Sequence, residues 1–437
     1  MRKLLTITLI GFSASFLSCL EEIDYFQDQY VKVLGLEGSA LAERVIELDN
    51  GDIMIIGSLG RASHDVTSGF IGLEIGAVED RAPFVAITDA NGNIKQMKSY
   101  PIESFDLANI ELENVANNSI FKEIIPDHNG GYIVLGQLSG FDLIAGPITI
   151  RNTPGSRTTA PFLVKLDENL NMKKLVPFEL DTIDGNLIYR ARAIMKPLPN
   201  NEVGLLLGMK VRNFTEFIGY AFYRMDHDLN ILDAGDDFDR PGFKLAYDFV
   251  YDQENRVAIL GERNDRMVMF RIPIDNMVYE AEEFQDIDHS GEFPNFNEHF
   301  ILEQENGNYA ILYTDPASRI VFSLKGPDLN NVGPPVDIPN PSSIESLIRV
   351  PRAFTQMING DFLIYNQHIP DSQEPIEGYL HRVSSTGQAL WSVQIDGTPG
   401  DVTETADGDI LVVANTVYNE TLHRINLIKL NENGELY

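Results

Sequence analysis

A phrase that occurs seven times along the chain limits its fold more than any other feature. The phrase is a turn containing Gly or Asn, followed by a short run of apolar and mostly β-branched residues, as in residues 51–57 (GDIMIIG). Such a run after a turn is typical of a β-strand, because branched side chains pack well on a pleated surface. The copies occupy residues 51–57, 131–136, 203–208, 257–261, 307–312, 360–365 and 408–413. The recurrence predicts a fold built from one repeated unit.

A second phrase alternates with the first, one copy after each. It is an apolar strand that ends in a polar turn, as in residues 84–92 (FVAITDANG). Asp, Asn and Gly in such a turn favour a tight hairpin. These copies occupy residues 84–92, 162–169, 222–226, 268–272, 321–324, 380–383 and 427–431. The two phrases therefore predict the two central strands of each unit.

Two further strands complete each unit. One precedes the first phrase, as at residues 44–48 and 121–125, and one follows the second phrase, as at residues 94–98. We name the four strands A to D in chain order. Four-stranded units at a period of about 50 residues are typical of β-propeller blades. Since no long segment shows an apolar helical stripe with caps, the predicted fold class is all-β, a seven-bladed β-propeller of four-stranded antiparallel blades.

The two ends of the repeat region are complementary. Residues 30–36 (YVKVLGL) match a D strand but precede the first A strand, and the seventh C strand is the last one in the chain. The N-terminal strand can therefore complete the last blade and remove the open edges of the ring. We predict one propeller domain over residues 30–437, closed in this way.

The first 18 residues have the layout of a secretory signal peptide. Arg2 and Lys3 form a basic start, and residues 4–16 carry no charge and are rich in Leu, Ile and Phe. This apolar stretch is short for a membrane span. Cys19, the only cysteine, follows Ser18 and resembles the lipidated cysteine of bacterial lipoproteins. The alternative is ordinary cleavage near Ser15 or Ser18, which would release a soluble exported protein.

Residues 19–29 are then predicted to be an acidic tether. Its start, LEEID at residues 20–24, resembles the surface-export signal of some Gram-negative lipoproteins, and a simple solvated linker is the equal alternative. A single cysteine excludes an intrachain disulfide, a redox pair and a zinc finger. A lipid anchor on Cys19 predicts a protein attached to the cell envelope, most simply the outer membrane, on its periplasmic side or its surface.

The repeat phrases together with the predicted anchor resemble those of bacterial, Gram-negative β-propeller lipoproteins of uncharacterised function. The resemblance covers roughly residues 30–437 and is carried by units of the form DGG, four apolar residues and Gly, then an apolar strand with Lys and Asp, as at residues 162–169 (FLVKLDEN). It implies the fold and an envelope location. It does not imply an activity, because propellers serve enzymes, receptors and scaffolds alike.

The charge of the chain excludes one class of partner. The formal net charge is −32, from 65 Asp and Glu against 33 Lys and Arg. Such a surface repels phosphate backbones, so no nucleic acid is expected as a partner. The predicted partners are the membrane, through the N-terminal lipid, and a glycan or an envelope protein. A hydrophobic fraction of 43% allows a large core, which separates this chain from disordered acidic sequences.

The irregular lengths of the connections predict where a ligand binds. The A–B turns are short, while the first two B–C connections (58–83 and 137–161) and several D–A connections are long. Loops on a rigid scaffold often carry function, so we expect the B–C/D–A face to be the working face, with neutral loop growth as the alternative. In these insertions, the candidate residues for binding a carboxylate or a sugar are Arg61, His64, Asp65, Arg151 and Arg157.

Catalytic and metal-binding signatures are weak. The sequence lacks HExxH, GxSxG and P-loop motifs. Asp286, Asp288 and Ser290 copy the first half of a calcium loop, although Asn297 stands where a bidentate Glu is expected. Residues 233–239 are an alternative acidic cluster. Calcium is the only cofactor the sequence suggests, and no catalytic residue is assigned.

Two function classes follow, beside a third interpretation as a purely structural envelope protein. The first is a cell-envelope lipoprotein whose propeller binds or scaffolds a glycan or protein ligand at its loop-rich face. The alternative is a polysaccharide-active enzyme, a glycosidase or lyase, on the same scaffold, which needs two carboxylates facing each other across the central pocket. His381 and Trp391 lie within strand phrases, so we expect structural roles for both.

Overall fold

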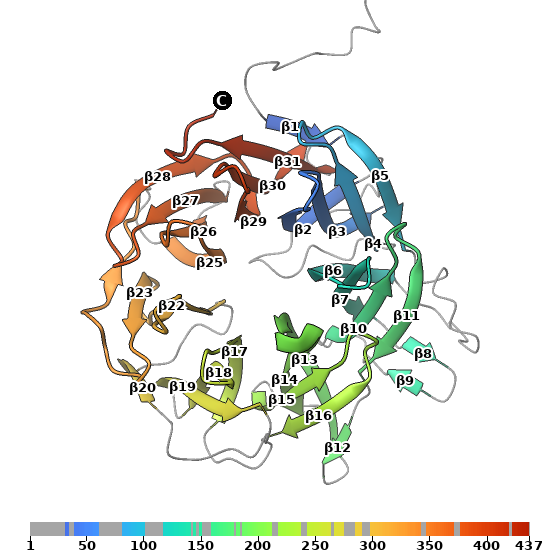
Figure 1. Ribbon diagram of the computed structural model, residues 1–437, viewed down its shortest axis with the longest axis horizontal. Coiled ribbons are helices and arrows are strands. Elements are labelled where there is room, and N and C mark those ends of the chain that lie inside the picture. Colours follow the sequence, from blue (N-terminus) through green and yellow to red (C-terminus); the bar gives the residue numbers. More distant parts are fainter. Residues whose placement is uncertain are drawn as a thin grey trace, which may run out of the picture.

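The chain forms a ring of seven four-stranded antiparallel blades, as the repeated phrases predict (Figure 1). This computed structural model describes residues 31–34, 39–60, 81–100, 117–140, 143–145, 148–150, 159–178, 181–183, 186–211, 217–236, 243–263, 266–274, 285–290, 298–341, 347–370, 376–418 and 422–436. Among these residues the one helical element is a single 3-10 turn, η2 (Pro199–Asn201). No described helix is long and apolar enough to cross a membrane.

The blades follow one another around the ring in chain order. Within each, the A strand lies innermost and the D strand outermost (Figure 1). Blade 1 contains β2 (Ser39–Glu47), β3 (Ile53–Gly60), β4 (Arg81–Thr88) and β5 (Ile94–Ser99). Blade 2 contains β6 (Asn117–Pro126), β7 (Tyr132–Gly140), β10 (Thr159–Leu166) and β11 (Met172–Pro177). Blade 3 contains β13 (Asn186–Leu198), β14 (Glu202–Val211), β15 (Phe217–Met225) and β16 (Ile231–Asp236).

The remaining blades repeat the pattern. Blade 4 contains β17 (Phe243–Tyr251), β18 (Arg256–Arg263), β19 (Arg266–Pro273) and β20 (Gln285–Ser290). Blade 5 contains β21 (Phe300–Glu303), β22 (Tyr309–Thr314), β23 (Ile320–Lys325) and β24 (Val336–Asp337). Blade 6 contains β25 (Leu347–Gln356), β26 (Phe362–Pro370), β27 (Glu377–Val383) and β28 (Ala389–Ile395). Blade 7 contains β29 (Thr398–Glu404), β30 (Ile410–Tyr418), β31 (Leu422–Leu430) and the N-terminal strand β1 (Val31–Leu34).

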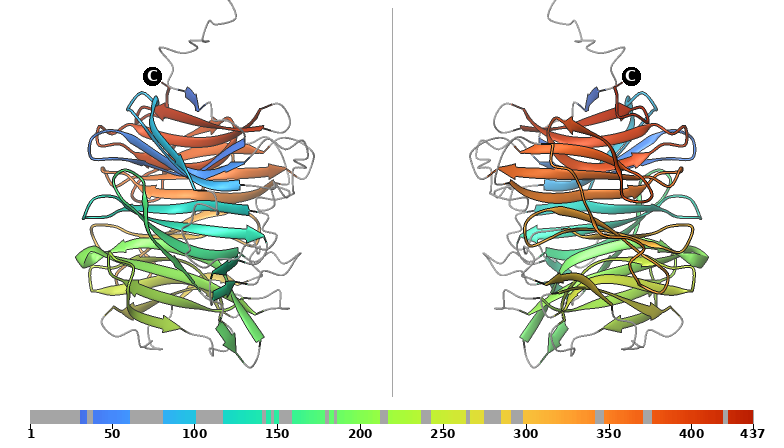
Figure 2. Two further views of the ribbon diagram at one scale, coloured as in Figure 1. Left: turned by 90° about the vertical axis from the view of Figure 1, so that its right-hand side faces the viewer. Right: turned by 90° about the vertical axis from the view of Figure 1, so that its left-hand side faces the viewer.

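Short turns join the A and B strands on one face of the ring (Figure 2). In blade 1 the Leu48 N–H donates to the Asp52 carbonyl over 2.8 Å, and the Gly51 N–H donates back to the Leu48 carbonyl over 2.8 Å. Gly51 has a φ of 78°, in the left-handed region that glycine enters without strain. Because successive strands of a blade run antiparallel, the B–C and D–A connections begin and end on the opposite face.

The core lies between the blades. It forms because successive side chains of each B strand point alternately to the two neighbouring blades. In β3, Ile53 and Ile55 pack toward blade 7, while Met54 and Ile56 pack toward blade 2. All four are almost fully buried, so both faces of the strand are apolar. The phrase ends on Gly57 because a Cβ there would lie 1.9 Å from the Leu41 carbonyl oxygen of the inner strand.

The N-terminal strand closes the ring, which confirms the predicted closure. β1 pairs antiparallel with β31, with Val31 opposite Ile428 and Leu34 opposite Ile425. Leu34 is buried in a cluster shared by blades 7 and 1. The last blade is thus built from the two ends of the described chain, and β1 lies on its outer rim (Figure 1).

Three departures from the simple repeat were not predicted. Blade 3 carries a fifth strand, β12 (Asp181–Ile183), paired with the inner strand β13. The long B–C connection of blade 2 contains a hairpin of β8 (Leu143–Ala145) and β9 (Ile148–Ile150). A single parallel bridge, Arg81 opposite Asn118, joins blades 1 and 2 into one eight-stranded sheet.

Candidate functional site

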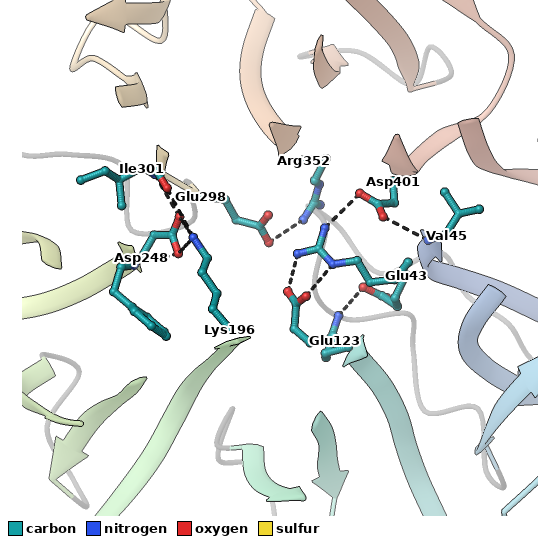
Figure 3. A network of polar contacts seen from close by, with 12 residues as sticks. Glu43, Val45, Glu123, Lys196, Asp248, Glu298, Ile301, Arg352 and Asp401 are labelled. Carbon is teal, nitrogen blue, oxygen red and sulfur yellow. Dashed lines mark hydrogen bonds and ion pairs between the residues drawn. The ribbon is translucent and has the colours of Figure 1, made fainter. Parts of the chain in front are cut away.

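The centre of the ring is lined by charged side chains from the inner strands (Figure 3). In five blades the pairing of the A and B strands shifts by one residue, four residues before the tight turn. A β-bulge of this kind bends the strand and re-aims its side chains, and bulges are frequent beside functional sites. The shifts fall between Ala42 and Arg44, Phe121 and Glu123, Ala246 and Asp248, Pro351 and Ala353, and Pro399 and Asp401.

Arg44 links three blades at the centre. Its guanidinium forms a two-pronged ion pair with Glu123 of blade 2, in which Nε donates to Oε2 over 2.8 Å. Nη1 donates to Oδ1 of Asp401, in blade 7, over 3.0 Å. The second carboxylate oxygen of Asp401 accepts the Val45 N–H over 3.0 Å. The arginine and both carboxylates are thereby fixed in orientation, because planar fork geometry suits carboxylates.

Three more ion pairs surround this centre (Figure 3). Lys122 Nζ lies 2.7 Å from Oε2 of Glu43. Lys196 Nζ lies 2.7 Å from Oδ1 of Asp248, whose other oxygen accepts the Ile301 N–H. The third pair joins Arg352 Nη1 to Glu298 Oε1 over 3.4 Å, while Arg352 Nε donates to Gln367. Every blade therefore contributes at least one residue to these central ion pairs.

Burial strengthens these central interactions. Asp401 is 8% exposed at its side chain, against 26% for Arg44 and 22% for Glu123. Burial raises the pKa of Glu123 and of Asp401, because the loss of hydration outweighs the attraction of Arg44. Burial alone would lower the pKa of Arg44, but the two carboxylates more than offset it, and this pKa lies well above its usual value.

Each carboxylate of the network is paired with a cation. This arrangement differs from a glycosidase site, in which one carboxyl group protonates the leaving oxygen and a second attacks or activates water. A carboxylate locked to an arginine or lysine cannot easily take either role. Within the described residues, the centre of the ring is therefore suited to holding the inner strands in position, and it gives no support to the enzyme alternative.

A second polar cluster lies buried in blade 6. His381 contacts Oγ of Ser392 through Nδ1 over 2.7 Å and Oδ1 of Asn366 through Nε2 over 2.6 Å. His368 is fully buried, and its ring lies 4.6 Å from that of Tyr379. Burial lowers the pKa of His368 to about 4 and that of His381 to about 3, with Arg349 adding to both shifts. The lowered pKa values keep both imidazoles neutral at pH 7, and the side-chain hydrogen bonds of His381 stay within blade 6, which fits the structural role expected for it.

The structure leaves most of the predicted site residues untested. Cys19, the loop candidates Arg61, His64 and Asp65, and the loop candidates Arg151 and Arg157 all lie outside the described residues. Their roles in lipidation and ligand binding stay predictions. The two residues that flank the first insertion are described: Gly60 at the end of β3 pairs with Arg81 at the start of β4.

The predicted calcium ligands lie in an outer strand. Asp286, Asp288 and Ser290 belong to β20, whose backbone pairs with β19 at Asp286 opposite Val268 and Ser290 opposite Arg266. A calcium loop instead needs a compact turn that brings alternate side chains onto one ion. The side chains of β20 are outside the description, so calcium binding stays a prediction. Among the described residues, no group of three His, Cys, Asp or Glu could hold a metal ion.

The sequence interpretation missed the central network. Arg44, Lys122 and Glu123 lie within the predicted A strands 44–48 and 121–125, and Glu43 directly precedes the first of them. The two pairs, Glu43–Arg44 and Lys122–Glu123, occupy matching positions of the repeat. Two adjacent charges within an otherwise apolar inner strand are a usable signal. In a propeller, such positions point toward the central axis, where charges from different blades meet.

This chain is similar in fold to several solved structures at low sequence identity. No family model matches the chain, and no curated protein gives a significant match. Among solved structures, a protein of unknown function from Bacteroides caccae is 12% identical with a TM-score of 0.38, over 63% of this chain and 88% of that one.

Two sialidase structures are also similar. The K499G mutant of NanB sialidase from Streptococcus pneumoniae is 10% identical with a TM-score of 0.43, over 94% of this chain and 71% of that one. The intramolecular trans-sialidase from Ruminococcus gnavus is 10% identical with a TM-score of 0.40, over 92% and 96%. Identities and scores this low carry no information about activity or ligand.

Proposed function

We propose that the protein is a cell-envelope lipoprotein whose propeller binds or scaffolds a glycan or protein ligand at the B–C/D–A face. Residues 1–18 would be the signal peptide, Cys19 the lipidated residue, residues 19–29 the acidic tether and residues 30–437 the propeller. The lipid would place the protein at the outer membrane, on its periplasmic side or its surface.

One observation supports the binding role. The inner strands of the ring are held together by ion pairs such as Arg44 with Glu123 and Asp401, while the strands that flank the long connections end on a single face. A rigid ring with variable loops on one side is a common design for recognition, because the scaffold holds the loops in place. The paired central carboxylates leave the enzyme alternative without support among the described residues.

The experiment removes the first insertion without disturbing the blade. Gly60 and Arg81 are opposed partners at the ends of β3 and β4, so an Asn-Gly turn can replace residues 61–80 and still close a hairpin. The full-length lipidated protein, purified in detergent, is screened against envelope polysaccharides and envelope proteins by biolayer interferometry. We expect saturable binding that weakens at least tenfold in the shortened variant.

A control changes the opposite face. Asn359→Ala lies in the A–B turn of blade 6, where its side chain contacts only its own turn among the described residues, and this variant should bind like the wild type. Release of reducing sugar from a bound polysaccharide would replace the binding role with the enzyme alternative. Absence of binding to every polysaccharide and protein in the screen would contradict the proposal.

A further inference from the structure

A buried arginine stands at the edge of the loop-rich face. Arg81 begins β4, directly after the first insertion, and is 7% exposed. Its Nη1 donates to the Ser58 Oγ over 3.2 Å. Its Nε and Nη2 are also buried, and they donate to no group among the described residues. Two sides of the guanidinium fork are therefore without an acceptor.

The position of Arg81 is built by two blades. Its backbone lies opposite Gly60 of blade 1 and, across the parallel bridge, opposite Asn118 of blade 2. The hydroxyl of Ser119, also in blade 2, donates to the Arg81 carbonyl over 3.4 Å. Ser58 and Ser119 are buried. Arg81 thus lies at the seam between the two blades that carry the long B–C insertions.

The charge on Arg81 is not balanced by a described carboxylate. The carboxylate that attracts it most is Glu43, but Glu43 already pairs with Lys122 over 2.7 Å. Burial lowers the pKa of Arg81 to about 10, so the side chain is still a cation at pH 7. An unpaired buried charge is costly, and native proteins almost always supply a counter-charge.

Guanidinium chemistry specifies the missing partner. The planar fork of an arginine offers parallel N–H groups that match the two oxygens of a carboxylate. The Ser58 hydroxyl accepts from Arg81 Nη1 and carries a hydrogen of its own that can be donated to a carboxylate oxygen. In a chain with a net charge of −32, an unpaired cation on the loop-rich side is also a local attraction for an anion.

We propose that Arg81 is the anchor of a carboxylate-binding site at the seam of blades 1 and 2, and that the ligand of the loop-rich face carries a carboxylate group. This inference rests on the proposed binding function and specifies its ligand chemistry. Arg81 supplies the charge and the Ser58 hydroxyl a neighbouring polar contact. The carboxylate can come from an acidic sugar or from an acidic amino acid, and the test separates these sources.

The test titrates the full-length protein in detergent with glucuronate, glutamate and, as the neutral counterpart, glucose. Unfolding temperature and calorimetric binding are measured at constant ionic strength. We expect glucuronate, glutamate or both to give a saturable rise in the unfolding temperature, because a ligand that binds only the folded state stabilises it. Glucose should give none. The stronger of the two acids identifies the source of the carboxylate.

Two variants locate the binding. Arg81→Met removes the charge but keeps an unbranched side chain, and it should lower the affinity for the carboxylate at least tenfold. Arg382→Met is the matched control, because the Arg382 guanidinium is already paired with Asp361 over 2.8 Å at the opposite face; its affinity should equal that of the wild type. Should Arg81→Met not fold, Ser58→Ala is measured instead, with an expected loss of a few-fold.

The outcomes are distinct from those of the proposed function. No carboxylate-dependent rise in the wild type, or equal affinity in Arg81→Met, would overturn the Arg81 site. If the face then still binds a neutral glycan, and this binding is lost with residues 61–80, the binding function stands and only its carboxylate chemistry is wrong. If Arg81→Met abolishes carboxylate binding and Arg382→Met preserves it, the result supports both the Arg81 site and the proposed binding function.

Discussion

At the scale of single residues, three leucines hold turns that usually require glycine or asparagine. Leu170, Leu229 and Leu329 have φ values of 59°, 59° and 64° in C–D turns. A bulky residue in this region costs about 1–3 kcal/mol. All three side chains are buried in the core between blades, and full burial of a leucine contributes about 1.5–3 kcal/mol. The two effects are of similar size, so the turn keeps its shape with an apolar residue.

A second residue-scale feature predicts sensitivity to acid. His368 is fully buried, and neither ring nitrogen has a hydrogen-bond partner among the described residues. Its pKa is lowered to about 4, from a value near 6.5 in the unfolded chain. Between these values the unfolded state binds a proton that the folded state does not. The stability is therefore complete above pH 6.5 and falls as the pH drops toward 4.

The prediction concerns the variant His368→Phe. Phenylalanine keeps a ring beside Tyr379 and cannot be protonated, so the variant should lose less stability in acid than the wild type. The difference in unfolding free energy between the two should change by up to about 1.4 kcal/mol per pH unit between pH 6 and pH 4.5. Urea unfolding at a series of pH values measures it. Parallel curves for the two proteins would contradict the lowered pKa.

At the scale of elements, the short strand β1 decides whether the ring is closed. Leu34 is buried in the cluster between blades 7 and 1. Lys32, in the same strand, is exposed, and its Nζ donates to the Asn93 side chain over 3.0 Å. The two residues therefore separate the effect of core packing from that of a surface contact.

We expect Leu34→Ala to lower the free energy of unfolding of the whole chain by about 2–5 kcal/mol, because it leaves a cavity in the closing blade. Lys32→Ala should change it by no more than about 0.5 kcal/mol. Urea unfolding followed by far-ultraviolet circular dichroism measures both. Equal, small effects would mean that β1 contributes nothing to closure.

At the scale of the whole molecule, closure and the proposed anchor together set the distance to the membrane. β1 lies on the outer rim of blade 7, and the proposed tether, residues 20–29, directly precedes the start of the propeller. At roughly 3.3 Å per extended residue the tether spans at most about 33 Å. The propeller would hang from its rim, close to the membrane, with the loop-rich face turned sideways and accessible.

The anchor itself is tested by Cys19→Ala. Without the thiol no diacylglycerol can be attached, so the variant should move from the membrane fraction to the soluble fraction of the cell envelope. Ser18→Ala, which keeps a small residue before the cysteine, should stay in the membrane fraction. Fractionation followed by immunoblotting distinguishes the two. A Cys19→Ala protein that still sediments with membranes would contradict lipidation as the anchor.

The sequence by itself determined the number of blades, the four strands of each and the closure by residues 30–36. These features are local or periodic: a turn residue and an alternating strand act on neighbours in the chain, and seven copies reinforce one another. The tight turns, such as Asp89 accepting the N–H groups of Asn91 and Asn93, follow from the same local chemistry. The predicted loop residues stay untested, since they lie outside the described part of the chain.

The tertiary structure alone decided which charges meet. Arg44 is 79 positions from Glu123 and 357 from Asp401, and no local pattern pairs residues so far apart. The isolation of Arg81 is also a tertiary property, because a missing partner can be recognised only when its surroundings are known. A repeated strand is specified by its own residues, whereas an ion pair or an unpaired cation depends on how the ring brings distant strands together.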